Sequence, residues 1–340
     1  MEENEVLVKI NEETDSRYGK PPNERNTEEL LRLGVVVIDK PCGPSSHEVG
    51  AWARNILGLK KAGHSGTLDP NVSGVLVVGL EDATKAMGFL LKSTKDYVGI
   101  MRFHRDISER NLLKEQMRIC PEDKLRDVRK VFKKFTGEIS QRPPVKSAIR
   151  RVVRKRKVYY LDALEVKERD VLFAVGCDAG TYIRKLCSDI GREIGGGANM
   201  LELRRTKVGG IGEERALTLQ KLSDARWLWK EKGDDSLMRK IILPLEDVVD
   251  LKKVWLRDSA IESVCSGAQL AAPGVAKLQA GIAKGDGIAL LSLKGELVAL
   301  ARAEMDSQEM LNSAHGIVAN TVRVLMKKGT YPKSWKSKAQ

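Results

Sequence analysis

The chain has 340 residues, of which 42% are hydrophobic and 31% are charged, a composition typical of globular rather than disordered or fibrous proteins. This length exceeds one ordinary domain and allows two. Lysine and arginine number 59 against 46 acidic residues, so the net charge is +13. Such an excess favours a polyanionic partner, with nucleic acid ahead of an anionic membrane.

Membrane insertion, disulfides and metal binding are not favoured. No segment approaches the roughly 18 consecutive apolar residues that span a bilayer, and the acidic N-terminus lacks the basic start and apolar core of a signal peptide. The five cysteines form an odd set without a C-x-x-C pair, and the four histidines show no metal-ligand spacing. We therefore predict a cytoplasmic protein without a disulfide framework, a membrane segment or a bound metal.

Charge is distributed unevenly along the chain. Residues 1–33 carry 5 basic and 9 acidic side chains, whereas residues 34–254 have a net charge of +13 and residues 255–340 a net charge of +4. Residues 1–33 are thus an acidic extension to a basic body. Pro21 and Pro22 within this extension predict a linker or loosely ordered arm.

The body, residues 34–250, mixes strands and helices without a regular alternation, which predicts an α+β fold rather than a doubly wound one. Ser45 and Glu48 form a capping box that starts one helix, and Gly58 is its expected end. In chain order the predicted elements are a strand at 34–39, the helix after Ser45, a glycine-rich loop at 60–74, a strand at 75–80, a helix at 121–135, a strand pair at 158–166 and 171–177, and a helix at 181–194.

The sequence changes character after Pro244. Residues 266–305 consist of short apolar runs that are broken repeatedly by glycine, a pattern typical of a small β-barrel. We place a domain boundary near residue 250, which gives a second domain of residues 251–335.

Residues 141–160 hold eight basic side chains and no acidic one. Two prolines near the start disfavour a helix there, so we expect an extended loop. All charges of this segment are positive, and the segment ends with two tyrosines. This pattern favours contact with RNA phosphates over the alternatives, a solvated protein surface or an exposed helix. The predicted RNA-binding residues are Lys146, Arg150, Arg151, Arg154 and Lys155.

The loop GHSGTLDPNVSG, residues 63–74, is the best candidate for chemistry. It displays His64 and Asp69 on an irregular backbone after two lysines, an arrangement compatible with a nucleic-acid active site. On spacing alone, a type I turn in which Asp69 caps its own backbone is the slightly better interpretation. The chain has no G-x-x-x-x-G-K-[S/T] motif, and its Gly195-Gly196-Gly197 run follows a helix rather than a strand, so neither nucleotide-binding signature is present.

Five motifs in fixed order resemble those of the TruB family of RNA pseudouridine synthases. They are Asp39-Lys40-Pro41 with Gly43-Pro44-Ser45-Ser46, Gly63-His64-Ser65-Gly66-Thr67-Leu68-Asp69-Pro70, Lys95-Asp96-Tyr97, Gly180-Thr181-Tyr182-Ile183-Arg184 and Leu203-Arg204-Arg205-Thr206. The resemblance covers roughly residues 34–215, and the tail from Trp255 resembles a PUA domain, a small RNA-binding barrel. Within the family the chain is similar to the archaeal group related to dyskerin, whose members are catalytic subunits of box H/ACA ribonucleoproteins.

The resemblance implies a mixed-sheet catalytic domain that isomerises uridine to pseudouridine with one carboxylate and no cofactor. It assigns that carboxylate to Asp69, its arginine partner to Arg184 and the active-site tyrosine to Tyr97. It also implies that Tyr182 and Leu203 line the uracil pocket and that His64 helps to hold the target nucleotide out of its stack. Without the family pattern, ordinary surface or packing roles would be expected for Arg184, Tyr97, Tyr182 and Leu203. We expect Lys40 and the turn around it to brace the catalytic loop, a structural rather than chemical role.

The implied partners are a box H/ACA guide RNA, a substrate rRNA or tRNA, and the small protein subunits of the ribonucleoprotein. A stand-alone synthase that modifies the T-loop of transfer RNA is the first alternative, because the catalytic motifs do not distinguish it. A non-catalytic RNA-binding scaffold is the second, and the intact set of Asp69, Tyr97 and Arg184 disfavours it.

Overall fold

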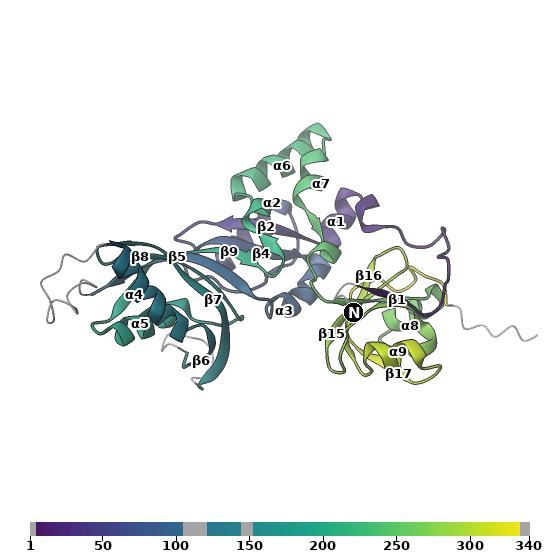
Figure 1. Cartoon of the computed structure of the whole chain (residues 1–340). Helices are drawn as coiled ribbons and strands as arrows, with labels where there is room; N and C mark the ends of the chain where they lie inside the picture. Colours follow the sequence, from purple (N-terminus) through teal and green to yellow (C-terminus); the bar gives the residue numbers. More distant parts are fainter. Residues whose placement is uncertain (1–4, 105–120, 144–151, 334–340) are drawn as a thin grey trace, which may run out of the picture.

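A computed structural model describes residues 5–104, 121–143 and 152–333, and it contains two β-sheets with helices around them (Figure 1). The predicted α+β body, followed by a small β-rich second domain, is confirmed. Within these ranges no helix is long and apolar enough to span a bilayer.

The larger sheet has ten strands in the order β11-β2-β4-β9-β5-β8-β7-β6, with β3 added to β4 and β10 to β9. Its members are β2 (Gly34–Lys40), β3 (Ala62–His64), β4 (Ser73–Leu80), β5 (Lys95–Phe103), β6 (Gly137–Gln141), β7 (Arg154–Lys167), β8 (Asp170–Cys177), β9 (Ala198–Val208), β10 (Ile211–Gly212) and β11 (Leu243–Pro244). Most neighbours are antiparallel, but β4 and β9 run parallel over a two-residue pairing at the centre. This central pairing brings the start of β4 close to the residues that follow Leu203 on β9.

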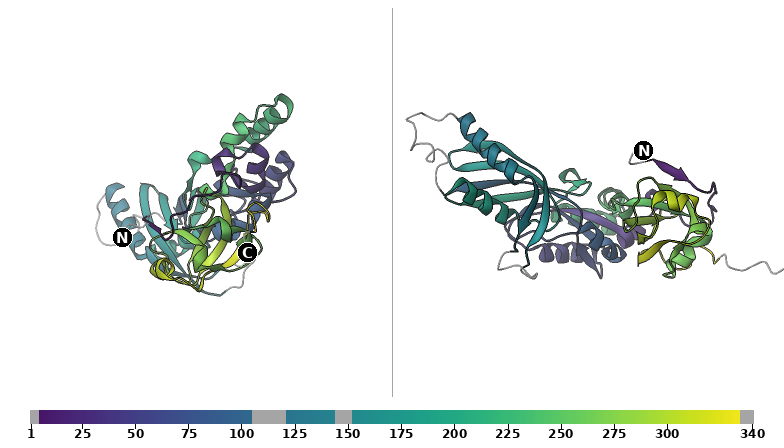
Figure 2. Two further views of the ribbon diagram at one scale, coloured as in Figure 1. Left: turned by 90° about the vertical axis from the view of Figure 1, so that its right-hand side faces the viewer. Right: turned by 60° about the horizontal axis from the view of Figure 1, so that its bottom comes forward.

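Within the described residues, seven α-helices pack on or beside this sheet (Figures 1 and 2). They are α1 (Thr27–Leu33), α2 (Ser46–Leu57), α3 (Met87–Leu90), α4 (Pro121–Lys134), α5 (Ile183–Ile194), α6 (Leu219–Lys232) and α7 (Ser236–Ile241). The predicted start and end of α2 are confirmed, because Ser45 and Glu48 form the capping box and Gly58 adopts a left-handed conformation. Helices α4 and α5 cover the β7–β8 end of the sheet, where their apolar faces enclose one core cluster.

The second domain is built on a seven-stranded sheet in the order β1-β14-β12-β15-β16-β17-β13. Its elements are β12 (Lys252–Leu256), α8 (Asp258–Cys265), β13 (Leu270–Ala271), β14 (Val275–Gln279), β15 (Gly287–Leu291), β16 (Leu297–Ala303), α9 (Ser307–Asn312) and β17 (Ile317–Val324). Apolar residues of β2, β4 and α3 share one core cluster with residues of β15 and β16. The two domains are therefore joined by a continuous apolar contact.

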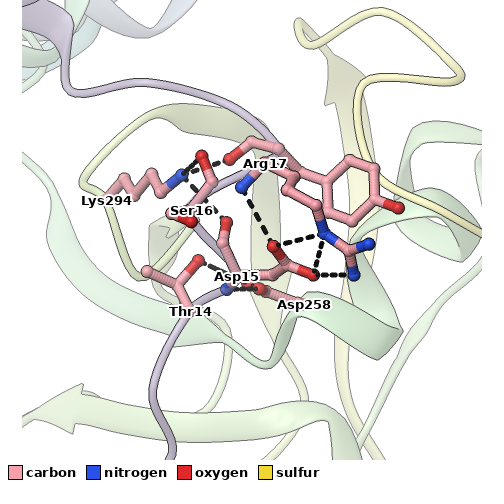
Figure 3. A network of polar contacts seen from close by, with 7 residues as sticks. Thr14, Asp15, Ser16, Arg17, Asp258 and Lys294 are labelled. Atoms are coloured by element: carbon pink, nitrogen blue, oxygen red, sulfur yellow. Dashed lines mark hydrogen bonds and ion pairs between the residues drawn. The ribbon is translucent and has the colours of Figure 1, made fainter.

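The expectation of a loosely ordered N-terminal arm is wrong for residues 5–33. Strand β1 (Val6–Val8) pairs antiparallel with β14, and α1 buries three leucines against the body. Between them the arm follows the second domain, where Asp258 accepts hydrogen bonds from the Thr14 hydroxyl and the Asp15 amide, both at 2.9 Å (Figure 3). The Lys294 ammonium also donates to the carbonyl oxygen of Asp15 at 3.0 Å. Pro21 and Pro22, which suggested a linker, lie instead at the start of a short 3-10 helix, Pro22–Glu24.

Candidate active site

The loop between β3 and β4 carries Asp69, and a buried lysine forms hydrogen bonds with its backbone. Lys40, at the end of β2, is fully buried and donates from Nζ to the carbonyl oxygens of Pro41 at 2.8 Å, Pro70 at 3.1 Å and Val72 at 2.9 Å. Burial lowers the pKa of the Lys40 ammonium. The predicted bracing role of Lys40 agrees with its contacts to Pro70 and Val72, which follow Asp69 in the loop.

The start of α2 fixes the same loop from the other side. The Ser46 hydroxyl accepts a hydrogen bond from the Leu68 amide at 2.8 Å and donates to the Leu68 carbonyl at 3.1 Å. The Gly43 amide donates to the carbonyl oxygen of Pro70 at 2.9 Å. Both backbone neighbours of Asp69 are thus anchored while the Asp69 side chain stays exposed.

Asp69 and Arg184 form an ion pair across two segments that are far apart in the sequence. Arg184 Nη2 lies 2.8 Å from Asp69 Oδ2, and the two side chains are 55% and 47% exposed. An exposed ion pair of this kind contributes only about 0–1 kcal/mol to the free energy of unfolding, so a stabilising role alone does not explain its presence. A turn does exist, since the Val72 amide donates to the Asp69 carbonyl at 2.9 Å, but the carboxylate is directed at Arg184.

A buried amide holds the start of α5, which carries Arg184. Gln141, the last residue of β6, is 3% exposed. Its Oε1 accepts the Tyr182 amide at 2.9 Å, and its Nε2 donates to the Tyr182 carbonyl at 3.2 Å. Tyr182 is the N-cap residue of the helix, so this pair of bonds sets the position from which Arg184 reaches Asp69.

An apolar wall lies beside the ion pair. Leu68, Ile183 and Leu203 are buried in one core cluster, and Tyr97 packs against it. Burial raises the pKa of the Tyr97 phenol to about 12, so this hydroxyl is protonated at neutral pH. The structure therefore brings together Asp69, Arg184, Tyr97 and Leu203, four residues that the family resemblance had singled out.

His64 lies on β3, a few residues before the anchored loop. Its ring packs edge-on against His47 with 5.0 Å between the ring centroids, and its two nitrogens are enclosed without a hydrogen-bond partner. Burial lowers the pKa of His64, which favours the neutral ring. Elsewhere in the described ranges, no group of three His, Cys, Asp or Glu side chains is placed to hold a metal ion.

Sequence profiles of known families match almost the whole chain. The profile of the TruB family pseudouridylate synthase (N terminal domain) matches residues 54–183, and the tRNA pseudouridylate synthase B C-terminal domain matches residues 184–250. The PUA domain matches residues 252–325 and the DKCLD (NUC011) domain matches residues 1–50.

A curated relative, the probable tRNA pseudouridine synthase B of Methanopyrus kandleri, is 49% identical over 332 residues, which cover 97% of this chain and 94% of the relative. The chain belongs to the TruB family. It is similar to a chain in the structure of an H/ACA RNP bound to a substrate RNA containing 2′-deoxyuridine, with 48% identity, a TM-score of 0.87 and 98% of both chains covered. It is also similar to a chain in the crystal structure of a Cbf5-Nop10-Gar1 complex, with 49% identity, a TM-score of 0.88, and 97% and 96% of the two chains covered. The predicted enzyme class, an RNA pseudouridine synthase, is confirmed.

Two buried cations of this TruB-family chain were not singled out from the sequence. Lys95, at the start of β5, donates from Nζ to the carbonyl oxygens of Leu91 at 2.8 Å and Ser93 at 2.5 Å. Burial lowers its pKa to about 8. Arg205, on β9, is 1% exposed. The alternation of side chains along a strand could have identified Arg205 as buried, because residues 203 and 205 share one face of β9. Arg204 faces outward to Asp39, whereas Arg205 faces inward.

The basic segment of this chain is placed only in part. Lys146, Arg150 and Arg151 lie outside the described residues. Arg154 and Lys155 lie on β7, which pairs with β6, so the expectation of a loop is wrong for residues 154–157, and the predicted strand begins four residues earlier than expected. Lys155 is exposed and forms a surface ion pair with Glu138 at 2.8 Å, an interaction that contributes little to stability.

Proposed function

We propose that this chain converts specific uridines in RNA to pseudouridine as the catalytic subunit of a box H/ACA guide-RNA ribonucleoprotein, with Asp69 as the reacting group. The observation that carries the proposal is the exposed Asp69–Arg184 pair at 2.8 Å on a loop whose backbone is anchored on both sides. A carboxylate held in this way is accessible to a nucleotide and cannot collapse onto its own loop.

The reaction places a definite demand on the site. The bond between C1′ and N1 of uridine breaks, a bond between C1′ and C5 forms, and a proton leaves C5 while N1 gains one. A single carboxylate can start this sequence by attacking the sugar or by removing a proton from it. Arg184 orients the Asp69 carboxylate and stabilises its negative charge in the resting enzyme.

The neighbouring side chains suit an extruded pyrimidine. Leu203 and the Tyr97 ring offer an apolar surface on which the uracil can lie, and the neutral Tyr97 hydroxyl can donate a hydrogen bond to it. Tyr182, the N-cap residue of α5, directly precedes Ile183, which belongs to the same core cluster as Leu203. His64 contributes by occupying the space vacated in the RNA stack, which requires its enclosed ring to move away from His47.

RNA binding extends beyond the catalytic centre. In the proposal the catalytic domain, residues 34–250, contacts RNA phosphates through Lys146, Arg150, Arg151, Arg154 and Lys155. The PUA domain, residues 251–335, holds the guide RNA, and the small subunits correspond to those of the similar Cbf5-Nop10-Gar1 complex. We place the assembly in the cytoplasm.

The stand-alone synthase is a second candidate, because the similar curated proteins are named tRNA pseudouridine synthase B. The two candidates are separated by assaying uridine isomerisation in the reconstituted assembly, with a matched guide RNA, a scrambled guide RNA or bare transfer RNA. We expect pseudouridine only where the matched guide pairs with the substrate. Activity on bare transfer RNA that is unchanged by the guide would establish the stand-alone enzyme.

A further inference from the structure

Arg205 is a buried arginine whose charge is not neutralised by a carboxylate. It is 1% exposed, and none of the ion pairs formed among the described residues includes it. Its guanidinium donates instead to backbone carbonyls, from Nε to Val75 at 2.8 Å and from Nη2 to Gly66 at 3.2 Å. Removing a guanidinium from water is costly, so a folded protein retains one where its directional hydrogen bonds have a use.

The strand register places Arg205 at the centre of the candidate site. On β9 it lies opposite Tyr97 of β5 on one side and opposite Gly74 of β4 on the other. Gly74 has φ +102, and a Cβ atom there would lie 2.2 Å from the Arg205 carbonyl oxygen. The chain therefore uses glycine at position 74 to bring β4 and β9 together at Arg205.

The side chain of Arg205 connects the two halves of the site. Besides donating to Gly66, three residues before Asp69, the guanidinium belongs to the direct cross-strand neighbour of Tyr97 and influences the pKa of the Tyr97 phenol. A guanidinium only donates, so a hydrogen bond between these two neighbours uses the phenol oxygen as its acceptor. Such a bond directs the hydroxyl hydrogen of Tyr97 away from Arg205, toward a different partner.

We propose that Arg205 is a positioning residue that fixes the Tyr97 hydroxyl as a hydrogen-bond donor toward the bound uracil. This inference rests on the proposed function, because it assigns Tyr97 a task in uridine isomerisation. It differs from a purely structural role, in which the carbonyl contacts to Val75 and Gly66 would be the only reason for Arg205.

A double-mutant cycle in the reconstituted assembly with guide RNA separates these roles. We expect Arg205→Met to reduce the single-turnover rate about 100-fold with RNA affinity within a few-fold of wild type, as for a misplaced catalytic group. In a Tyr97→Phe background, the same substitution should cost less than about threefold. Equal losses in both backgrounds would overturn the proposal, because they would show that Arg205 acts independently of the Tyr97 hydroxyl.

Two further variants protect this experiment against simple misfolding. Arg205→Lys keeps the charge and can reach one acceptor, so we expect it to fold and to lose rate only in the presence of the Tyr97 hydroxyl. Arg204→Lys is the matched control, since this neighbour faces outward to Asp39 and Glu213. We expect it to stay within a few-fold of wild type in both backgrounds. A loss for Arg205→Lys that is independent of the Tyr97 hydroxyl would count against the proposal.

A second readout does not require activity. The ¹⁹F resonance of fluorotyrosine at position 97 reports the pKa of that phenol. Arg205 lowers this pKa, whereas Asp69 and Cys177, the other charged or titratable groups that influence the phenol, raise it. Arg205→Met should therefore raise the pKa of residue 97, and an unchanged titration would contradict the proposed hydrogen bond. If the wild-type assembly formed no pseudouridine, the proposed function would fail, while this titration would still test the role of Arg205.

Discussion

Buried charges have different partners at the Asp69 loop and at the junction of the arm with the second domain. Near the loop, Lys40, Lys95 and Arg205 are each less than 5% exposed and donate to backbone carbonyls. At the junction, Arg25 of the arm makes a bidentate pair with Glu246, with N–O distances of 2.8 and 2.9 Å and side chains that are 9% and 8% exposed.

The Glu246 carboxylate of the junction also accepts the amide of Leu297 at 2.8 Å, so it ties the arm, the body and the second domain together. The charges of this junction cancel, and its role is to hold three segments in place. The cations around the Asp69 loop do not cancel, because their partners are neutral carbonyls. They leave positive charge beside Asp69, the only exposed carboxylate of the anchored loop, and we expect this charge to favour the approach of RNA phosphates.

Breaking the junction should reduce stability more than activity. Arg25→Met leaves Glu246 buried without its partner, so we expect the free energy of unfolding to fall by about 3–5 kcal/mol in urea denaturation. The folded fraction of this variant should still form pseudouridine at the wild-type rate.

The matched control is Arg32→Met, which removes an arginine of α1 that pairs with Asp82 at 3.1 Å and is 36% exposed. We expect a loss of no more than about 1 kcal/mol. Equal losses for the two variants would show that the buried junction contributes no more than a surface pair.

The uncancelled charge of Lys95 predicts a dependence of stability on pH. Its pKa is about 8 in the folded protein, against an ordinary value of 10.5. Below about pH 8 Lys95 is protonated in both the folded and the unfolded protein, but between about pH 8 and 10.5 it is protonated only in the unfolded protein. The free energy of unfolding should therefore rise with pH across this interval.

Chemical denaturation at several pH values checks this prediction. Lys95→Met should remove the rise, whereas Lys130→Met, which alters an exposed lysine of α4, should keep it. A rise of the same size in both variants would mean that Lys95 is not the group responsible.

The exposed positive charge of β7 should act on RNA through phosphates. Replacing Arg154, Lys155 and Lys157 with alanine should weaken binding across RNA sequences and reduce the log–log salt slope by about 0.7–0.9 for each phosphate that is no longer neutralised. The control removes three lysines elsewhere, at Lys221, Lys230 and Lys240. An unchanged slope for the β7 variant, or weaker binding confined to one RNA sequence, would exclude phosphate contact as the role of this strand.

Local signals in the sequence predicted the body of the fold well. The limits of α2 followed from Ser45, Glu48 and Gly58, because capping depends on residues within one helical turn. The strand pair β7–β8 was also expected, although β7 begins at Arg154, before the predicted start. The first residues of β7 belong to the basic run. They were not predicted as a strand, because charge says little about pairing with a neighbouring strand.

Contacts between distant segments could not be predicted in the same way. Strand β1 pairs with residues about 270 positions away, and nothing within the arm encodes that partner. The five motifs named the residues of the site through a family resemblance, but they did not distinguish the exposed Arg204 from the buried Arg205. That distinction depends on the register of β9 between β4 and β5, which is a property of the whole sheet.

The most direct test of the account is pseudouridine formation by Asp69→Asn in the reconstituted assembly, beside Asp224→Asn, which alters an exposed carboxylate on α6. The substitution at Asp69 keeps the shape of the side chain but removes its ability to attack the sugar or to accept a proton. We expect Asp69→Asn to form no detectable pseudouridine while binding RNA within a few-fold of wild type, and Asp224→Asn to match wild type in both. Substantial isomerisation by Asp69→Asn would show that Asp69 is only a turn residue and would contradict the account.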